Sequence, residues 1–233
     1  MRETSFLSRL FDLLAPRACA MCGQRLAVDE EVVCSMCNLH LPRTYFWQDA
    51  YDNEMARLFW IQLPVERAAA WMFYQPHSQA GNMIYDLKYR SHPETGEMIG
   101  RMMAEEMMAD GFFEGIDLIV PVPLARKRQR QRGYNQSMEI AKGISQVTRI
   151  PIAGDVVRRN SFSESQTRKN RQGRQENVEG AFELVNAEKV SGKHLLIVDD
   201  IVTTGATIIA CGKELAKAGD VKVSVASIGM TKG

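Results

Sequence analysis

The sequence predicts an α/β protein with a mostly parallel sheet flanked by helices, preceded by a small module that is rich in cysteine. From about Ala68 onward, short apolar segments alternate with longer segments of helical periodicity, which is typical of such sheets. Residues 116–124 are almost continuously apolar, as strands covered on both faces are. Two Cys-x-x-Cys pairs within residues 19–37 predict the separate module.

Length and composition fit one main domain with a small appendage. The chain has 233 residues, and a domain usually takes ~100–200. Its 45% hydrophobic and 24% charged residues are ordinary for a globular protein. The net charge of +1 gives no global attraction to polyanions, so any such binding must come from local clusters. We assign residues 1–50 to an N-terminal helix with the cysteine module and residues 51–233 to the α/β domain.

The N-terminal region lacks the continuous apolar segment of a secretory signal, and the chain has no run of ~18 apolar residues. We therefore expect a cytoplasmic protein with reduced thiols and without a transmembrane segment. A short amphipathic helix is predicted before Pro16. Its apolar residues at helical spacing are Phe6, Leu7, Leu10, Leu13 and Leu14.

The clustered cysteines predict a structural zinc site. Each Cys-x-x-Cys pair can present both sulfurs to one ion, and four thiolates suit tetrahedral Zn²⁺. Because all four positions are filled, the metal is expected to hold structure and not to catalyse. A redox pair is disfavoured since nothing thioredoxin-like surrounds it, and the colour of an iron–sulfur cluster would reveal that alternative. The predicted ligands are Cys19, Cys22, Cys34 and Cys37, whereas Cys211 is expected to be a buried apolar residue.

Apolar periodicity then predicts the elements of the α/β domain in order. The methionines of the second helix are expected to fill the core. Strands are predicted at residues 67–75, 116–124, 180–185, 193–200 and 222–230, and helices at 78–90, 92–110, 137–148 and 205–219.

The stretch "LLIVDDIVTTGAT", residues 195–207, has the order strand, acidic pair, small turn and helix. Ligands of parallel sheets bind beyond the carboxyl ends of the strands, and a helix N-terminus attracts anions through its unpaired N–H groups. Small residues let a phosphate approach the backbone closely. We therefore expect a phosphate against Thr203, Thr204, Gly205, Ala206 and Thr207.

The acidic pair suits a different part of the same ligand. Asp199 and Asp200 would repel a phosphate, but their carboxylates can accept hydrogen bonds from sugar hydroxyls. A sugar phosphate is therefore the predicted ligand. The alternative is that Asp200 caps a helix and Asp199 only ends a strand.

Two basic segments predict further anion contacts. Residues 126–132 follow a buried strand directly, and the N–H groups of a turn there can form an anion nest beside arginine side chains. Arg126 and Arg132 are candidates for phosphate contact, and Lys88 at a helix end either reaches the same group or balances the helix dipole. Residues 158–182 are either a mobile loop that closes over the site or a connector.

Five short motifs follow the paired cysteines, in the order "LKY", "VPVPL", "RGYNQS", "SQTRKNRQGRQENVEGAF" and "VDDIVTTGAT". Together they resemble the ComF family, which includes the GntX-type proteins. The resemblance covers nearly the whole chain. It implies a type I phosphoribosyltransferase fold behind a zinc module, phosphoribosyl pyrophosphate and Mg²⁺ as ligands, and a role in DNA uptake during natural transformation.

The resemblance also implies displacement of pyrophosphate at the anomeric carbon by an acceptor that the sequence does not identify. Two other functions stay open. One is an accessory protein for single-stranded DNA, acting with transformation proteins, with residues 126–132 and 168–174 as a phosphate track. The other is a sensor that binds the sugar phosphate without consuming it and signals through its zinc module.

Overall fold

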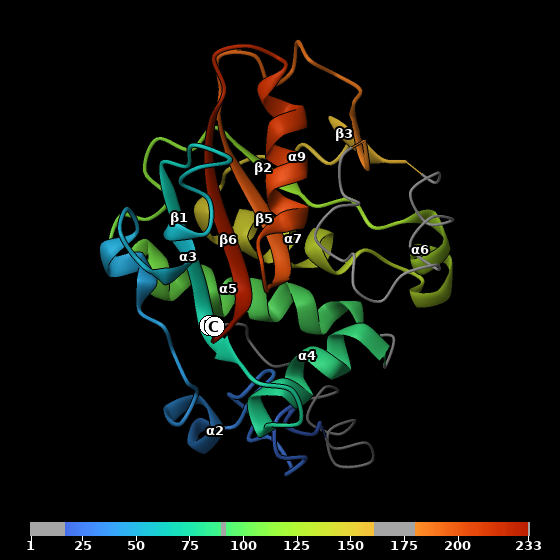
Figure 1. The fold of residues 1–233 in the computed structure, drawn as a ribbon. Coiled ribbons are helices and arrows are strands. Elements are labelled where there is room, and N and C mark those ends of the chain that lie inside the picture. Colours follow the sequence, from blue (N-terminus) through green and yellow to red (C-terminus); the bar gives the residue numbers. More distant parts are fainter. Residues whose placement is uncertain (1–16, 90–91, 161–179, 233) are drawn as a thin grey trace.

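A four-stranded parallel sheet, ordered β1-β6-β5-β2, forms the centre of the molecule (Figure 1). The computed structural model describes residues 17–89, 92–160 and 180–232. The prediction of a mostly parallel sheet flanked by helices is confirmed. The strands are β1 (Arg67–Tyr74), β2 (Leu118–Pro121), β5 (His194–Val202) and β6 (Lys222–Thr231).

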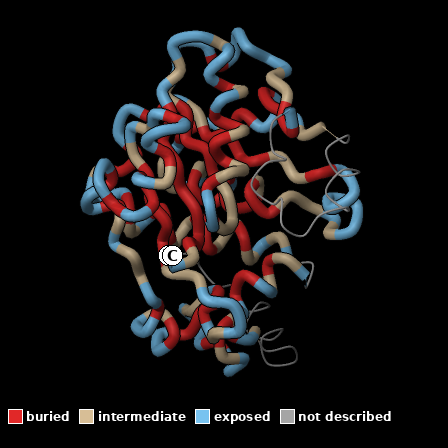
Figure 2. The backbone as a smooth tube through the Cα atoms, in the orientation of Figure 1, coloured by how far each residue is buried: buried red, intermediate tan, exposed pale blue. Residues whose placement is uncertain are grey.

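Helices cover both faces of this sheet, and each face has its own buried apolar cluster. Figure 1 shows α9 in front of the sheet and α7 behind it. Figure 2 shows that the strands between them are buried along most of their length. One face carries α4 (Gln79–Tyr89), α5 (Pro93–Met108) and α7 (Gln136–Thr148), and the other carries α3 (Glu54–Arg57) and α9 (Ala206–Ala216).

The strand register brings the end of β2 next to the acidic pair. Pro121, the last residue of β2, pairs with Val198, so the chain after β2 and the residues after Val198 meet at one edge of the sheet. This edge is the carboxyl end of the parallel strands, where ligands of such sheets bind.

Close contact between α5 and α7 fixes the middle of α7 against α5. A Cβ atom on Gly143 would lie 2.0 Å from the carbonyl oxygen of Glu97, and one on Gly100 would lie 2.2 Å from that of Ile140. Only glycine permits this approach. The expected core methionines are confirmed in part, since Met103 and Met107 are fully buried but Met108 is exposed.

The cysteine module packs on the α4 and α5 side, and its buried residues belong to the same cluster as those helices. It contains the short helix α2 (Ser35–Leu39), and it is followed by the 3-10 helix η1 (Phe46–Asp49). Arg43 joins the module to α5 through an ion pair with Glu106, whose carboxylate also accepts the Trp71 Nε1–H. The domain boundary after residue 50 stays a prediction.

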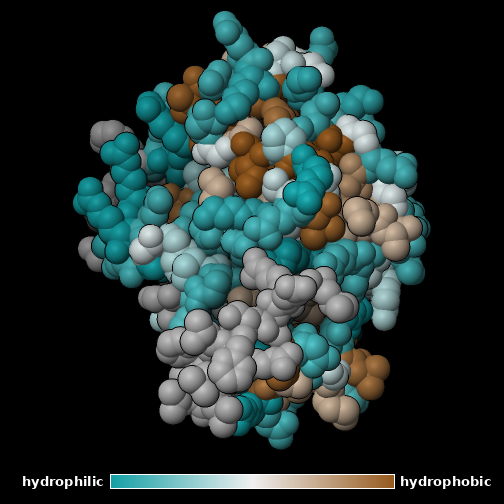
Figure 3. All heavy atoms as spheres, turned by 180° about the vertical axis from the view of Figure 1, so that it is seen from behind, coloured by the Kyte–Doolittle hydropathy of each residue, from teal (hydrophilic) through white to brown (hydrophobic). Residues whose placement is uncertain are grey.

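The basic segment after β2 differs from the expected turn. It forms the helix α6 (Arg126–Arg132), because arginine, lysine and glutamine favour helices and none of these residues is buried. Gly133 ends it with a left-handed φ of 82°. Figure 3 shows that the side of the molecule opposite Figure 1 is mostly hydrophilic, with scattered apolar side chains.

The predicted strand at residues 180–185 is found as β4 (Phe182–Leu184), which pairs with β3 (Val157–Arg159) in a separate antiparallel sheet. Residues 161–179, most of the segment interpreted as either a closing loop or a connector, lie outside the described residues, and so does the predicted amphipathic helix before Pro16. Within the described ranges, no helix combines the length and apolar character needed to span a membrane.

Candidate functional site

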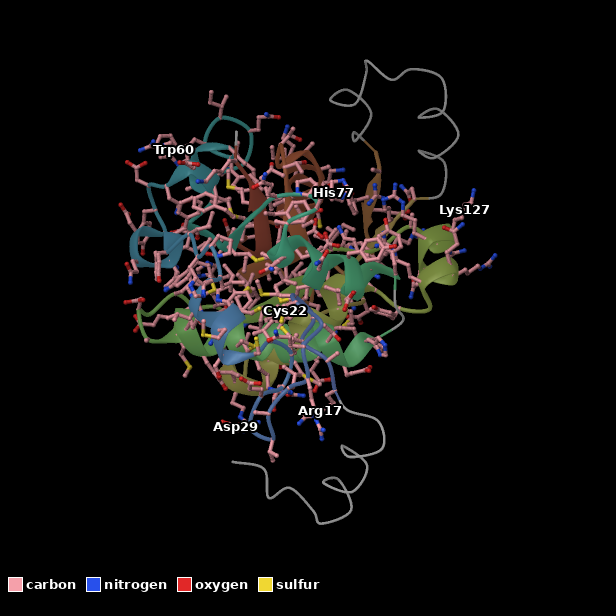
Figure 4. The ribbon with its side chains drawn as sticks, turned by 90° about the horizontal axis from the view of Figure 1, so that it is seen from below. Arg17, Cys22, Asp29, Trp60, His77 and Lys127 are labelled. Carbon is pink, nitrogen blue, oxygen red and sulfur yellow. The ribbon has the colours of Figure 1, made fainter. Side chains whose placement is uncertain are left out.

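The four predicted metal ligands converge. The Sγ atoms of Cys19, Cys22, Cys34 and Cys37 all lie within 4.8 Å of one another. The Cys22 and Cys34 sulfurs are 3.8 Å apart, and two thiolates ~2.3 Å from one tetrahedral zinc ion would be separated by about 3.8 Å. Figure 4 labels Cys22, with other sulfur atoms gathered beside it. The cluster is therefore consistent with a zinc site.

Backbone groups prepare one thiol of this cluster for ionisation. Burial raises the pKa of Cys19, but the backbone N–H groups of Cys22, Cys34 and Met21 outweigh it, so the pKa falls to about 7. Burial and the neighbouring thiols raise the pKa of Cys37. Ionisation of the other thiols is therefore unfavourable here without a cation, as expected of a metal-binding cluster.

The acidic pair lies within β5 and has partners from two helices. Lys88 Nζ of α4 is 3.0 Å from Asp200 Oδ2, and the side chains are only 20% and 15% exposed. The Ser137 hydroxyl of α7 donates to Asp199 Oδ1 at 3.0 Å, and the Asp200 N–H donates to the same oxygen at 2.9 Å. The structure therefore brings Lys88 to the acidic pair.

The Asp199 carboxyl group has a strongly raised pKa. Burial and the negative charge of Asp200 raise the pKa of Asp199 to about 7, against the opposing effects of the Asp200 N–H, the Ser137 hydroxyl and Lys88. Asp199 thus titrates near neutral pH, and groups of this kind are often found at functional sites.

The small loop after β5 is open to solvent. Thr203 and Thr204 are exposed, and Gly205 adopts a left-handed φ of 76° as the residue that precedes α9. A Cβ atom on Gly205 would lie 2.9 Å from Phe59 Cε1, so both the backbone and the packing require glycine. The alternative in which Asp200 caps the helix is wrong, because Gly205 occupies the N-cap position. Ala206 and Thr207 form the first turn of α9, whose N–H groups an anion can use.

The two candidate arginines have different surroundings. The Arg132 guanidinium lies 5.5 Å from the centre of the Tyr89 ring, and its NH1 donates to Gln136 Oε1 at 2.8 Å. Arg126 is exposed on α6, and Figure 4 shows the next residue, Lys127, pointing away from the body of the molecule. The structure therefore places Arg132 beside the ends of α4 and α7, and Arg126 on the solvent side.

Two residues of the site were not singled out from the sequence, Gln136 and Ser137. Gln136 is 1% exposed, and its Nε2 has no partner among the described residues. Both lie in the motif "RGYNQS", directly after the turn that Asn135 ties to β2 by donating from Nδ2 to the Val122 carbonyl at 3.0 Å. The available signal was that this motif opens a predicted helix directly after the basic segment of residues 126–132.

Comparison with known proteins agrees with this arrangement. Residues 89–228 match the family described as Phosphoribosyl transferase domain. The chain belongs to this phosphoribosyl transferase family. The DNA utilization protein YhgH of Escherichia coli (strain K12) is 27% identical over 228 residues, covering 91% of this chain and 96% of that protein.

This member of the phosphoribosyl transferase family is also similar to a competence protein. Competence protein F of Haemophilus influenzae is 33% identical over 110 residues, or 47% of this chain and 48% of that protein. These relatives confirm the resemblance to the ComF family. A solved glutamine phosphoribosylpyrophosphate amidotransferase from B. subtilis is 20% identical, with a TM-score of 0.39, over 60% of this chain and 30% of that chain.

Removing two cysteines tests whether the cysteine cluster of this phosphoribosyl transferase protein binds zinc. The Cys34→Ser, Cys37→Ser double variant should bind less than about 0.1 zinc per chain and unfold at least about 5 °C lower, because metal affinity contributes to folding. Metal analysis and thermal unfolding measure both effects. The control Cys211→Ala, outside the cluster, should keep one zinc ion. A double variant that retains a full equivalent of zinc would contradict the assignment.

Asp199→Asn should stabilise the protein at alkaline pH. The pKa of Asp199 is raised to about 7, above its unfolded value, so the stability linked to its proton is present below pH ~4 and is lost as the pH rises through about 7. Asparagine can accept the same hydrogen bonds without the charge. We expect a gain of about 1–3 kcal/mol in the free energy of unfolding at pH 8, and little at pH 4.

Urea unfolding at both pH values measures this difference. The exposed Asp110 supplies the matched control, since Asp110→Asn should change stability by less than about 0.5 kcal/mol. An Asp199→Asn protein that is less stable than the wild type at pH 8 would show that the ionised Asp199 carboxylate does not destabilise the folded protein.

Proposed function

We propose that the protein binds phosphoribosyl pyrophosphate with Mg²⁺ and transfers its phosphoribosyl group to an acceptor. The observation that carries this proposal is the acidic pair near the end of β5, followed after two more residues by an open small-residue loop and the start of α9. A carboxylate pair for hydroxyl groups and a helix N-terminus for a phosphate are thus adjacent. Membership of the phosphoribosyl transferase family supports the same ligand.

The parts of the donor divide among the neighbouring elements. The 5′-phosphate binds at Thr203 to Thr207, and the ribose hydroxyls bind at Asp199 and Asp200. Pyrophosphate binds toward Lys88 and Arg132, two cationic residues that lie at this end of α4 in the described part of the chain, with Gln136 Nε2 as a further donor. Because Lys88 neutralises Asp200, the donor's negative charges meet less repulsion at this edge.

The carboxylates also suit Mg²⁺, which prefers hard oxygen ligands. Asp199 Oδ2 has no hydrogen-bond partner in the described part of the chain, so it can serve a cation or a ribose hydroxyl. Bound Mg²⁺ would neutralise charge on the leaving pyrophosphate. In the proposed reaction the bond from the anomeric carbon to a pyrophosphate oxygen breaks, and the acceptor forms a new bond to that carbon.

A link to DNA metabolism is part of the proposal, because the relatives are a DNA utilization protein and a competence protein. The helix α6 favours direct contact with single-stranded DNA as a second candidate function. It carries five cationic residues among seven, and none of the seven is buried. Such an exposed cationic helix can follow a phosphate backbone.

Titration calorimetry with phosphoribosyl pyrophosphate and Mg²⁺ tests the main proposal. Combining Asp199→Asn with Asp200→Asn should weaken binding at least about tenfold, or ~1.4 kcal/mol, because the ribose hydroxyls lose charged acceptors. Inorganic pyrophosphate, which has no ribose, should lose much less affinity in this variant. Absence of donor binding to the wild-type protein, or equal binding to the variant, would refute the proposal.

Arginine variants distinguish the two anion-binding surfaces. Arg132→Ala should weaken donor binding by about tenfold, whereas the exposed Arg126→Ala should change it less than about twofold. For oligonucleotide binding we expect the opposite order, with a larger loss of affinity in Arg126→Ala than in Arg132→Ala. Combining Arg126→Ala with Lys127→Ala should reduce the dependence of log affinity on log salt by about 1.4, since two phosphate contacts are lost.

Fluorescence anisotropy at several salt concentrations measures the oligonucleotide arm. Oligonucleotide binding that is insensitive to salt, or equal in wild-type and variant proteins, would eliminate DNA contact through α6. Equal effects of Arg132→Ala and Arg126→Ala on donor binding would contradict the assignment of pyrophosphate to Arg132.

A further inference from the structure

The first turn of α7 reaches the acidic pair through Ser137. This residue is 4% exposed, and its hydroxyl donates to Asp199 Oδ1 at 3.0 Å. The hydrogen bond joins residues 62 positions apart in the chain, so it depends on the fold and not on local sequence.

The two oxygens of Asp199 have different surroundings. Oδ1 accepts from both the Ser137 hydroxyl and the Asp200 N–H, while Oδ2 has no hydrogen-bond partner among residues that the structure describes. Two donors in fixed positions on one oxygen hold the carboxylate in one orientation. Oδ2 is consequently the oxygen left to accept from a ligand.

The position of Ser137 is itself fixed by Asn135, two residues earlier in the chain. Asn135 Oδ1 caps the helix by accepting the Ser137 N–H at 3.2 Å, and Asn135 Nδ2 donates to the Val122 carbonyl at 3.0 Å. The cap therefore ties the first turn of α7 to the chain just beyond β2. The glycine contact between α5 and α7 fixes the rest of this helix.

The other groups that face Asp199 do not replace the hydroxyl. Asp200 lies next to it on β5 and repels it, and Lys88 from α4 is paired with Asp200 Oδ2. The Cys211 thiol of α9 is buried nearby, and burial and the charge of Asp199 raise its pKa, so it stays a neutral thiol. Among the residues that the structure describes, Ser137 is thus the side-chain donor that orients Asp199.

We propose that Ser137 is a positioning residue of the donor site, holding the Asp199 carboxylate so that Oδ2 faces the ribose hydroxyls. This inference rests on the proposed function for the identity of the ligand. Because the hydroxyl also favours the ionised carboxylate, its removal should raise the pKa of Asp199 further. Ionised Asp199 would then be scarcer at neutral pH.

Carboxyl ¹³C NMR titration of ligand-free protein gives a first readout that needs no donor. Ser137→Ala should raise the pKa of Asp199 by about half to one unit, whereas Ser137→Thr, which keeps the hydroxyl, should leave it near the wild-type value. An unchanged pKa in folded Ser137→Ala protein would overturn the inference. If the alanine variant fails to fold, Ser137→Thr and Ser137→Cys, a hydroxyl and a weaker thiol donor, make the same comparison.

Donor binding at two pH values gives the second readout. With phosphoribosyl pyrophosphate and Mg²⁺, Ser137→Ala should lose about 3- to 10-fold in affinity at pH 7, and the loss should shrink at pH 8.5, where Asp199 ionises in both proteins. In an Asp199→Asn background the same substitution should have little further effect. Equal losses at both pH values and in both backgrounds would show a merely structural role and overturn the inference.

The two readouts separate the inference from the proposed function. A wild-type protein that binds no donor overturns the proposed function, while the NMR titration still decides whether Ser137 controls Asp199. A wild-type protein that binds donor, with no pH-dependent effect of Ser137→Ala, overturns the positioning role and leaves the proposed function standing.

Discussion

Two adjacent carboxylates at the end of a largely buried strand are the constraint on which the site depends. Like charges this close, with little water around them, cannot both ionise without compensation, and the structure compensates each differently. Asp200 has an ion pair with Lys88, while Asp199 has two neutral hydrogen bonds and a pKa raised to about 7. The helices that supply these partners must therefore be held accurately at the edge of the sheet.

Packing away from the site provides that accuracy. The glycine contacts between α5 and α7 bring α7 close enough to hold its first turn at β5. The helix α4 is fixed along its length by residues fully buried in the core, Met83, Ile84 and Leu87, and Asn82 Nδ2 donates to the Met21 carbonyl at 3.1 Å. Because Met21 lies between two cysteines of the cluster, one helix connects the cysteine module to Asp200. The module thus supports the helix that positions Lys88.

What could be predicted from the sequence was local in origin. Apolar segments predicted the strands, cysteine spacing predicted the converging cluster, and "VDDIVTTGAT" predicted an acidic pair beside an open helix start. The contact of Lys88 with Asp200 and that of Ser137 with Asp199 depend on strand register and helix packing, which no short motif encodes. The helical form of α6 was missed because its charges were interpreted as a turn, although arginine, lysine and glutamine favour helices.

The charge of Asp199 is the feature that the fold itself does not explain. An asparagine there could accept the same hydrogen bonds from Ser137 and from the Asp200 N–H, without the desolvation and repulsion that raise the pKa. Stability alone would favour the neutral side chain at neutral and alkaline pH. A ligand that brings hydroxyl donors and a divalent cation to Oδ2 reverses this preference, because it stabilises the ionised form. A carboxylate at position 199 is therefore the side chain expected under the proposed function, whereas stability alone would favour asparagine.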